Sequence, residues 1–343
     1  MNRPDLAIVV LNWNGRKLLE EYIPPLVAHT PPEVADLVVI DNGSTDDSLA
    51  YLQEAFPQVK LVRLSENYGF AGGYNRGLRQ LDYSYYCLLN SDVRVSPHWC
   101  DRPLALLMEG LAAVQPKLRS DRQPEAFEYA GAAGGELDRW GYPYCRGRLF
   151  DTVELDHGQY DDECEILWAT GACYFVSSEA FWRVGGFDES FFAHMEEIDL
   201  SWRLWLSGGH LRYTPDSVVY HLGGATLEMG SPRKSYLNFR NNLRMLYKNL
   251  PTRHARRRIL LCRLPLDLLA ALTFLVKGQP RHATAVLRAV RDFYRTRRQL
   301  ARSADQPWYQ PWYQPTATPP IAHYSLLWQY HLRRRRTYDQ LPS

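Results

Sequence analysis

Short apolar runs alternate with helical spacing over residues 1–90, and this alternation restricts the fold more than any other feature. The runs are brief and continuous, which is typical of strands covered on both faces. Strands alternating with helices at this spacing predict an α/β fold with a parallel sheet and right-handed crossovers. We expect strands at Leu6–Leu11, Leu37–Ile40, Val59–Leu64 and Tyr85–Leu89, and helices over Arg16–Val27, up to Phe56 and from about Ala71.

Polar residues follow these apolar runs, at the point where each expected strand ends. They are Asn12 and Asn14, Asp41, Asn67, and Asn90 with Asp92. Ligands of parallel sheets bind beyond the carboxyl ends of the strands. A single Asp in such a place is usually a helix cap, but several in register predict a ligand site.

The tripeptide Asn90-Ser91-Asp92 offers a carboxylate and amide oxygens at a strand end, which suit Mg²⁺ or Mn²⁺. A turn with an Asp cap would explain the same three residues. His221, at the end of the expected strand Leu211–His221, could add an imidazole ligand, although a single His there is more often structural.

Nucleotide contacts have candidates nearer the amino terminus. The ring of Trp13 could stack on a base, and Asp41 could accept a hydrogen bond from a pyrimidine N3–H. The turn from Asn67 through Gly69 to Asn75 and Arg76 stands at a helix start, where backbone N–H groups and the guanidinium could approach phosphate. Its glycines match neither the P-loop nor the G-x-G-x-x-G pattern.

A general base has candidates in Glu196 and Glu197, which follow the bulky apolar residues Phe191 and Phe192. An apolar lead of this kind predicts burial, and burial beside another carboxylate raises a pKa toward neutrality. Asp199 and Arg203 stand four residues apart and are expected to pair on a helix. Glu196 and Glu197 then remain for the site.

The charge of the chain is distributed unevenly. Residues 251–302 hold thirteen Lys or Arg against two acids, whereas the whole chain has a net charge of only +2. A basic segment of this kind predicts an anionic partner. Within it, Ile259–Val276 is apolar but carries Arg263, Pro265 and Asp267, so we favour amphipathic helices in a membrane interface over a spanning helix. A solvated helical face is the alternative, and the apolar residues fit membrane better than nucleic acid.

The motifs together resemble the inverting glycosyltransferases of family 2, in their bacterial rhamnosyltransferase-like branch. The resemblance covers about two-thirds of the chain, from Val9 to His221, and its motifs keep the family's order. The matching stretches are VVLNWNG, VVIDNGSTDDS, ENYGFAGGYNRG, CLLNSDV, TGACYFVSSEAF, GGFDESFFAHMEEIDLSWRL and VVYH.

The resemblance implies a GT-A fold, with a mixed, mainly parallel nucleotide-binding sheet flanked by helices and a membrane-associating helical extension at the carboxyl-terminal side. We therefore expect a catalytic domain over residues 1–235, in which 1–115 bind the nucleotide sugar and 116–235 bind the acceptor. A basic amphipathic helical segment, 236–302, would follow. The tail, 303–343, contains a repeated Trp-Tyr-Gln-Pro sequence and the run Arg333–Arg336.

Carried over by position, the resemblance implies that Asp41 contacts the pyrimidine and that Asp92 and His221 hold the metal. Glu197 would be the base that takes the proton of an acceptor hydroxyl. Two departures from the family pattern affect the site. Asn90 stands where many relatives have Asp, and Glu197 is one methylene longer than the usual Asp.

The implied function is metal-dependent, inverting hexosyl transfer from a dTDP-rhamnose or UDP-sugar donor to a glycan or lipid-linked hydroxyl in cell-surface polysaccharide synthesis. The six cysteines form no paired motif and the amino terminus has no signal peptide pattern, so we expect a cytoplasmic protein on the inner face of the plasma membrane. The competing interpretations are a non-catalytic nucleotide-sugar-binding scaffold and a sugar nucleotidyltransferase.

Overall fold

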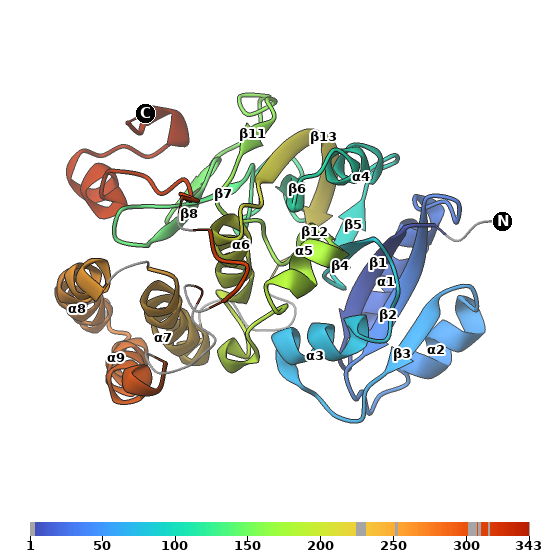
Figure 1. Ribbon diagram of the computed structural model, residues 1–343, viewed down its shortest axis with the longest axis horizontal. Helices are drawn as coiled ribbons and strands as arrows, with labels where there is room; N and C mark the ends of the chain where they lie inside the picture. Colours follow the sequence, from blue (N-terminus) through green and yellow to red (C-terminus); the bar gives the residue numbers. More distant parts are fainter. Residues whose placement is uncertain are drawn as a thin grey trace.

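The computed structural model describes residues 4–223, 231–250, 253–300, 307, 310–314 and 316–342. Among these residues, nine strands form a mixed sheet and four more form a small antiparallel sheet beside it (Figure 1). Alternate residues of β1 (Leu6–Asn12) point into two different apolar clusters, one on each face of the large sheet. The helix α1 (Arg16–Ala28) packs into one cluster and α3 (Gly69–Leu78) into the other. Both faces are therefore covered, as the continuous apolar runs predict.

Strand direction brings distant segments of the chain to one edge of the large sheet. The order is β11-β13-β6-β12-β4-β1-β2-β3, with β5 beside β13. Strands β1 to β4 are parallel, β12 runs against both β4 and β6, and β13 is parallel to β6. The ends of β1, β2, β4, β6 and β13 and the start of β12 therefore share an edge. The strands are β2 (Ala35–Asp41), β3 (Lys60–Arg63), β4 (Tyr85–Leu89), β5 (Val93–Val95), β6 (Ala113–Ser120), β11 (Cys164–Glu165), β12 (Cys173–Ser177) and β13 (Leu211–His221).

The predicted helices are present and differ at some of their ends, whereas the helices Asp101–Met108 and Ser178–Arg183 were not predicted. The helix expected after residue 235 begins earlier, because Ser231 Oγ caps it by accepting a hydrogen bond from the Lys234 amide at 3.3 Å, and Pro232 suits its first position. The remaining helices are α2 (Ser48–Ala55), α4 (Asp101–Met108), α5 (Ser178–Arg183), α6 (Glu196–Leu206), α7 (Pro232–Asn249), α8 (Arg253–Val276) and α9 (Pro280–Leu300). Short helical turns occupy Glu189–Phe191, Trp328–Leu332 and Tyr338–Gln340.

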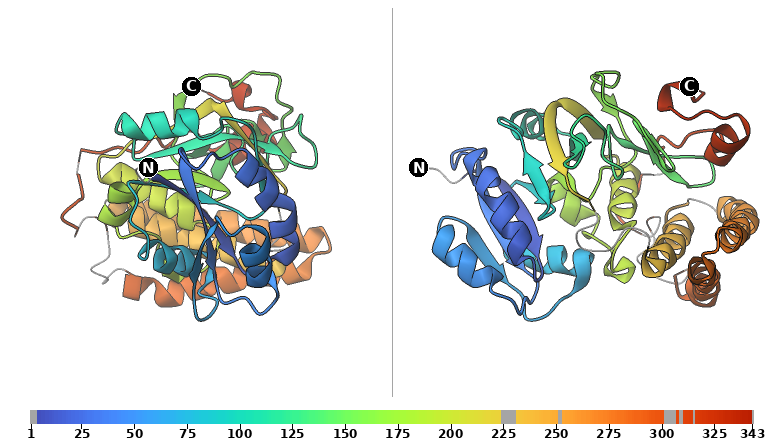
Figure 2. Two further views of the ribbon diagram at one scale, coloured as in Figure 1. Left: turned by 90° about the vertical axis from the view of Figure 1, so that its right-hand side faces the viewer. Right: turned by 180° about the vertical axis from the view of Figure 1, so that it is seen from behind.

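The small sheet is covered by residues from the carboxyl-terminal tail. The Leu326 amide donates to Asp138 at 2.8 Å, and the Tyr338 amide donates to Glu154 at 2.9 Å. Figure 2 shows the tail against this sheet from behind. Trp308, Tyr309 and Pro315 of the predicted repeat lie outside the described residues. The small sheet comprises β7 (Gly135–Leu137), β8 (Pro143–Cys145), β9 (Arg148–Leu149) and β10 (Thr152–Val153).

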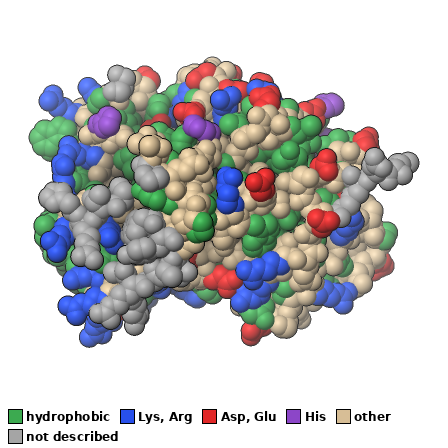
Figure 3. Space-filling view, viewed as in Figure 1, with side chains coloured by type: hydrophobic (Ala, Val, Ile, Leu, Met, Phe, Trp, Pro, Cys, Tyr) green, Lys and Arg blue, Asp and Glu red, His purple; other side chains and the backbone are tan. Residues whose placement is uncertain are grey.

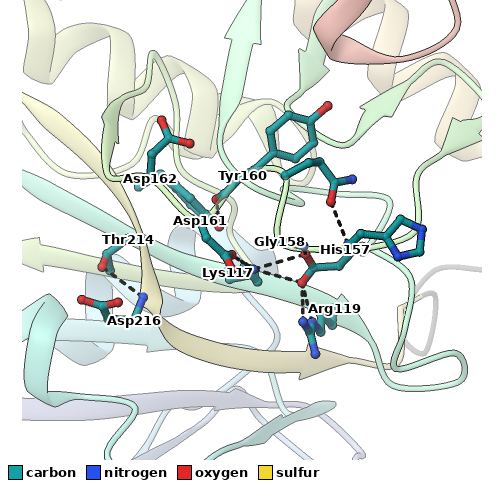
Figure 4. A network of polar contacts seen from close by, with 12 residues as sticks. Lys117, Arg119, His157, Gly158, Tyr160, Asp161, Asp162, Thr214 and Asp216 are labelled. Atoms are coloured by element: carbon teal, nitrogen blue, oxygen red, sulfur yellow. Dashed lines mark hydrogen bonds and ion pairs between the residues drawn. The ribbon is translucent and has the colours of Figure 1, made fainter.

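A buried ion-pair network fixes the loop between the two sheets (Figure 4). The carboxylate of Asp156, wholly buried, pairs with Lys117 Nζ at 3.0 Å and with Arg119 Nε at 2.7 Å. Burial alone would raise the pKa of Asp156, but hydrogen bonds from the Gly158 amide, Lys117 and Arg119 lower it. The network joins β6 to the loop and gives it a structural role.

Helices α7, α8 and α9 pack side by side at the end of the molecule remote from β3 (Figures 1 and 2). Among the described residues, Ala255–Val276 is the single helical stretch long and apolar enough to cross a membrane by length and composition, and its most apolar window is only 22% buried. Two charged residues in its apolar part are turned inward. Arg263 and Asp267 are buried and lie 3.1 Å apart, and Arg263 also donates to Asn242 at 2.6 Å.

Candidate active site

Asp92 and His221 come together at the shared sheet edge. His221 ends β13 opposite Val93, and the Leu222 amide donates to the Asp92 carbonyl at 3.0 Å. His221 Nε2 lies 3.2 Å from Asp92 Oδ1 and 3.4 Å from the Asn90 amide nitrogen. Both Asp92 and His221 are buried. The structure thus joins two predicted residues that stand far apart in the sequence.

The spacing of these two side chains fits a divalent cation. Neighbouring ligand atoms of an octahedral Mg²⁺ or Mn²⁺ site lie about 3 Å apart, close to the Asp92–His221 separation. The described residues contain no third His, Cys, Asp or Glu that completes a protein-only metal cluster. Mg²⁺ usually retains waters and substrate phosphates among its ligands, so two protein ligands suit an ion shared with a diphosphate.

Glu128 holds the other nitrogen of His221 and was not predicted from the sequence. Its Oε1 lies 3.3 Å from His221 Nδ1. Burial lowers the pKa of His221, but the charge of Glu128 and hydrogen bonds to Asp92 and Glu128 outweigh it and raise the pKa to about 10. A carboxylate behind a histidine is the usual arrangement that orients an imidazole toward a metal. Glu128 lies in an irregular segment, where no motif marks it.

Asn12 and Asp41 end adjacent strands and contact one another. The Asn12 amide donates to Asp41 Oδ1 at 3.2 Å, and the Ser44 amide donates to Asp41 Oδ2 at 3.1 Å. Asn14 adopts a positive φ of 50° and accepts from the Thr45 amide at 2.7 Å, which ties the two strand ends together. Trp13, which stands between Asn12 and Asn14 in the sequence, is 49% exposed, so its ring is accessible for stacking on a base.

The turn before α3 is held by amide side chains. Asn67 Oδ1 accepts from the Gly69 amide at 2.9 Å, where Gly69 has a φ of 72° that favours glycine. The side-chain amide of Asn75 donates to the Phe187 carbonyl at 2.8 Å and accepts from the Phe187 N–H at 3.0 Å. It therefore has a structural contact in place of the predicted ligand contact. Arg76 pairs with Glu189 at 2.7 Å, and this pair would have to open for Arg76 to reach phosphate.

Glu196 and Glu197 begin α6 in different surroundings. Glu196 is buried with no hydrogen-bond partner for Oε2, and burial together with the charge of Glu197 raises its pKa well above the ordinary value. Glu197 is half-buried, and desolvation raises its pKa to about 7. Asp199 is occupied as predicted, with Arg203 Nε at 2.8 Å. Glu197 therefore has the accessibility and the pKa that a general base requires near neutral pH.

Glu197 is connected to the Asp92 edge through the start of β12. A Cβ placed on Gly171 would lie 3.9 Å from the Cβ of Glu197. The backbone carbonyl of the next residue, Ala172, accepts a hydrogen bond from the backbone N–H of Asn90 at 3.0 Å. The Gly171–Ala172 backbone thus contacts the surroundings of Glu197 at one residue and the end of β4, two residues before Asp92, at the next.

The backbone immediately before the two glutamates is strained. Phe192, His194 and Met195 have φ values of 65°, 68° and 74°, a region that residues other than glycine rarely adopt. Asn241 of α7, wholly buried, holds this segment. Its amide nitrogen lies 2.8–3.0 Å from the carbonyl oxygens of Phe191, Ala193 and His194. Asn241 is a second residue that the sequence pattern did not indicate.

Comparisons with known proteins relate the sequence to glycosyltransferases. The sequence matches Glycosyl transferase family 2 over residues 7–152. It is 27% identical over 232 residues to the N-acetylglucosaminyl-diphospho-decaprenol L-rhamnosyltransferase of Mycobacterium tuberculosis, covering 63% of this chain and 75% of that protein.

Solved structures share the fold. The mannosyltransferase PcManGT from Pyrobaculum calidifontis, in complex with GDP-Man and Mn²⁺, has a TM-score of 0.53 at 15% identity, covering 91% of this chain and 85% of that one. GalNAc-T7 with UDP, GalNAc and Mn²⁺ has a TM-score of 0.54 at 18% identity, covering 72% of this chain and 48%, about half, of its own length. The predicted GT-A-like sheet with a helical region after it is confirmed. Residues 7–152 match glycosyltransferase family 2, and over this part the chain is identified as a member of that family.

Proposed function

We propose that this protein transfers a hexosyl group, rhamnose from dTDP-rhamnose or a sugar from a UDP donor, to a hydroxyl of a lipid-linked glycan. The observation that supports the proposal is the contact of Asp92 with His221 at the sheet edge, together with the position of Glu197 beside Gly171, where β12 approaches that edge. The similarity to a rhamnosyltransferase acting on a diphospho-decaprenol substrate supports the donor and acceptor classes.

In the proposed reaction, Glu197 accepts the proton of the acceptor hydroxyl as its oxygen attacks the anomeric carbon. The new C–O bond forms on the face opposite the diphosphate, the bond to the diphosphate oxygen breaks, and its electron pair leaves with that oxygen. The anomeric centre inverts. General-base assistance of this kind contributes about 10²–10⁴-fold to the rate.

The donor is held by the strand ends in this proposal. Trp13 stacks on the base, Asp41 accepts from the pyrimidine N3–H, and the turn at Gly69 offers backbone N–H groups to phosphate. A Mg²⁺ or Mn²⁺ ion bound by Asp92 and His221 would supply positive charge to the diphosphate. Glu128 keeps the His221 ring turned toward that position.

Donor hydrolysis without acceptor tests the proposal directly. We expect Mn²⁺-dependent release of UDP or dTDP from one sugar nucleotide in a panel, with free UDP or dTDP inhibiting and GDP not inhibiting. The preference follows from Asp41, which complements the N3–H of a pyrimidine. Release that proceeds equally well in excess chelator would contradict the metal assignment, and selective inhibition by GDP would contradict the pyrimidine assignment.

A membrane location for the reaction is supported by the outward face of α8. Leu261, Leu269 and Val276 are 75%, 57% and 81% exposed, while Arg263 and Asp267 of the same helix are buried. Figure 3 shows Lys and Arg side chains among apolar ones over this end of the molecule. An apolar face flanked by basic residues suits an anionic bilayer surface, where each basic residue contributes about 1 kcal/mol. Cosedimentation with anionic vesicles, weakened by high salt, tests this contact; equal pelleting with neutral vesicles would oppose it.

A further inference from the structure

A groove of about 630 Å³ separates the amino-terminal ends of α7 and α9. We call it the basic groove. Arg233 and Tyr236 of α7 and Arg281, Thr284 and Arg288 of α9 line it. A smaller hollow of about 380 Å³ shares the Arg281 wall and extends along Gly278–His282.

The three arginines of the basic groove form no ion pair with a described residue. Arg233, Arg281 and Arg288 are all exposed, and within the described part of the chain no carboxylate lies at ion-pair distance from any of them. Asp292, farther along α9, is already bonded by Arg291 at 3.0 Å and by Tyr236 Oη at 3.1 Å. Asp292 also acts on Arg288 through its charge, so three guanidinium groups around one hollow face one carboxylate. This excess of positive charge favours a multiply charged anion that accepts bidentate hydrogen bonds.

One end of the basic groove meets the apolar face of α8. That helix ends at Val276, 81% exposed, and the turn that follows it forms the wall of the smaller hollow. The ring of His282 stacks on Phe274 at 5.2 Å and its Nδ1 lies 2.8 Å from Ser235 Oγ, which fixes the turn against α7. An amphiphile could therefore place its apolar chain along α8 and its anionic head in the groove.

The other end of the basic groove approaches the catalytic segment. The Arg233 guanidinium lies 5.5 Å from the centre of the Phe192 ring. Phe192 in turn contacts the turn before α3, since the Phe70 amide donates to the Phe192 carbonyl at 3.2 Å. The groove thus runs from the apolar helix toward the residues that precede Glu196 and Glu197.

We propose that the basic groove binds the diphosphate of the lipid-linked acceptor, with its sugar directed toward Glu197. The assignment rests on the proposed function and adds the site that recognises the acceptor. A diphosphate carries the charge and the paired oxygen acceptors that Arg233, Arg281 and Arg288 require. This anion is separate from the donor diphosphate, which belongs at the Asp92 edge.

Direct binding tests the groove without relying on turnover. The probe is geranylgeranyl diphosphate in phosphatidylcholine vesicles, compared with geranylgeraniol in the same vesicles, with phosphatidylglycerol vesicles and with soluble pyrophosphate. The variant is Arg281→Gln with Arg288→Gln, and the matched control is Arg298→Gln with Arg295→Gln, which removes the same charge farther along α9. We expect the groove variant to bind the diphosphate vesicles about tenfold more weakly for each arginine removed, with the control near wild type.

The remaining arms identify the source of the anion and separate the two proposals. Soluble pyrophosphate that competes with the diphosphate vesicles for the wild-type protein, and competes less for the groove variant, supports recognition of the diphosphate itself. Equal losses of vesicle binding in variant and control, or preference for phosphatidylglycerol over the diphosphate lipid, overturn the groove assignment. An equal loss of UDP affinity would assign the groove to the donor and also overturn it. Wild-type protein that binds the probe but hydrolyses no sugar nucleotide contradicts the proposed function and leaves the groove assignment standing.

Discussion

Replacing Glu197 by glutamine is expected to lower kcat by about 10²–10⁴-fold while UDP binding stays near wild type. The amide keeps the size of the side chain but cannot accept the hydroxyl proton. Because the base acts in its ionised form and its pKa is raised to about 7, kcat of the wild-type protein should fall as the pH drops through 7. The Glu197→Gln variant should lose this dependence. Initial rates across pH, with UDP affinity measured in parallel, provide the test.

Glu196→Gln is the matched control for that experiment. Glu196 is buried without a partner for Oε2, and burial raises its pKa well above the ordinary value. Burial therefore favours the protonated form, which the neutral amide resembles. We expect this variant to retain most of its turnover. Normal turnover in Glu197→Gln together with inactivity in Glu196→Gln would exchange the two roles.

Asp92→Asn is expected to reduce turnover by at least about 10²–10³-fold and to remove the Mn²⁺ dependence of UDP binding. The substitution takes one full negative charge from the position 3.2 Å from His221, where the cation would be shared with the diphosphate. Titration of UDP with and without Mn²⁺ measures the effect independently of catalysis.

Two further variants serve as comparisons for the Asp92→Asn variant. Glu128→Gln should weaken Mn²⁺-dependent UDP binding by about 10–100-fold, because it loosens the orientation of His221 without removing a ligand. Asp121→Asn removes the same charge as Asp92→Asn from a residue paired with Arg94 at 2.7 Å, near the same edge, and should leave the Mn²⁺ effect intact. Wild-type Mn²⁺ dependence in Asp92→Asn would place the cation elsewhere.

Strand positions could be predicted from the sequence where local pattern and packing agree. The limits of β4 and β13 coincide with the predicted ones. The apolar residues of β4 fill the sheet interior, and the polar Asn90 follows directly. The residues Trp168–Val176 have a strand-like sequence, but β12 begins only at Cys173. Trp168 is turned toward the small sheet, where its indole N–H donates to the Glu136 carbonyl at 2.9 Å, a contact that no local pattern specifies.

The site could be predicted where residues stand in recurrent stretches, and not where they act across the fold. Asp92 and His221 were recognised from such stretches, and the structure brings them together. Glu128 and Asn241 depend on contacts that form only after the sheet and α7 have packed. The pairing of Arg76 with Glu189, 113 positions away, likewise cannot be predicted from the spacing of residues in the sequence.

The covering of the small sheet by the tail has a consequence for the order in which the protein assembles. The bond from Leu326 to Asp138 joins positions 188 residues apart, and that from Tyr338 to Glu154 joins positions 184 apart. Contacts of such long separation form slowly, because the intervening chain must first lose much of its freedom. During synthesis, the small sheet would therefore stay uncovered until the three preceding helices had left the ribosome. A fusion partner that hinders this last docking step would disturb a region nearly two hundred residues upstream in the chain.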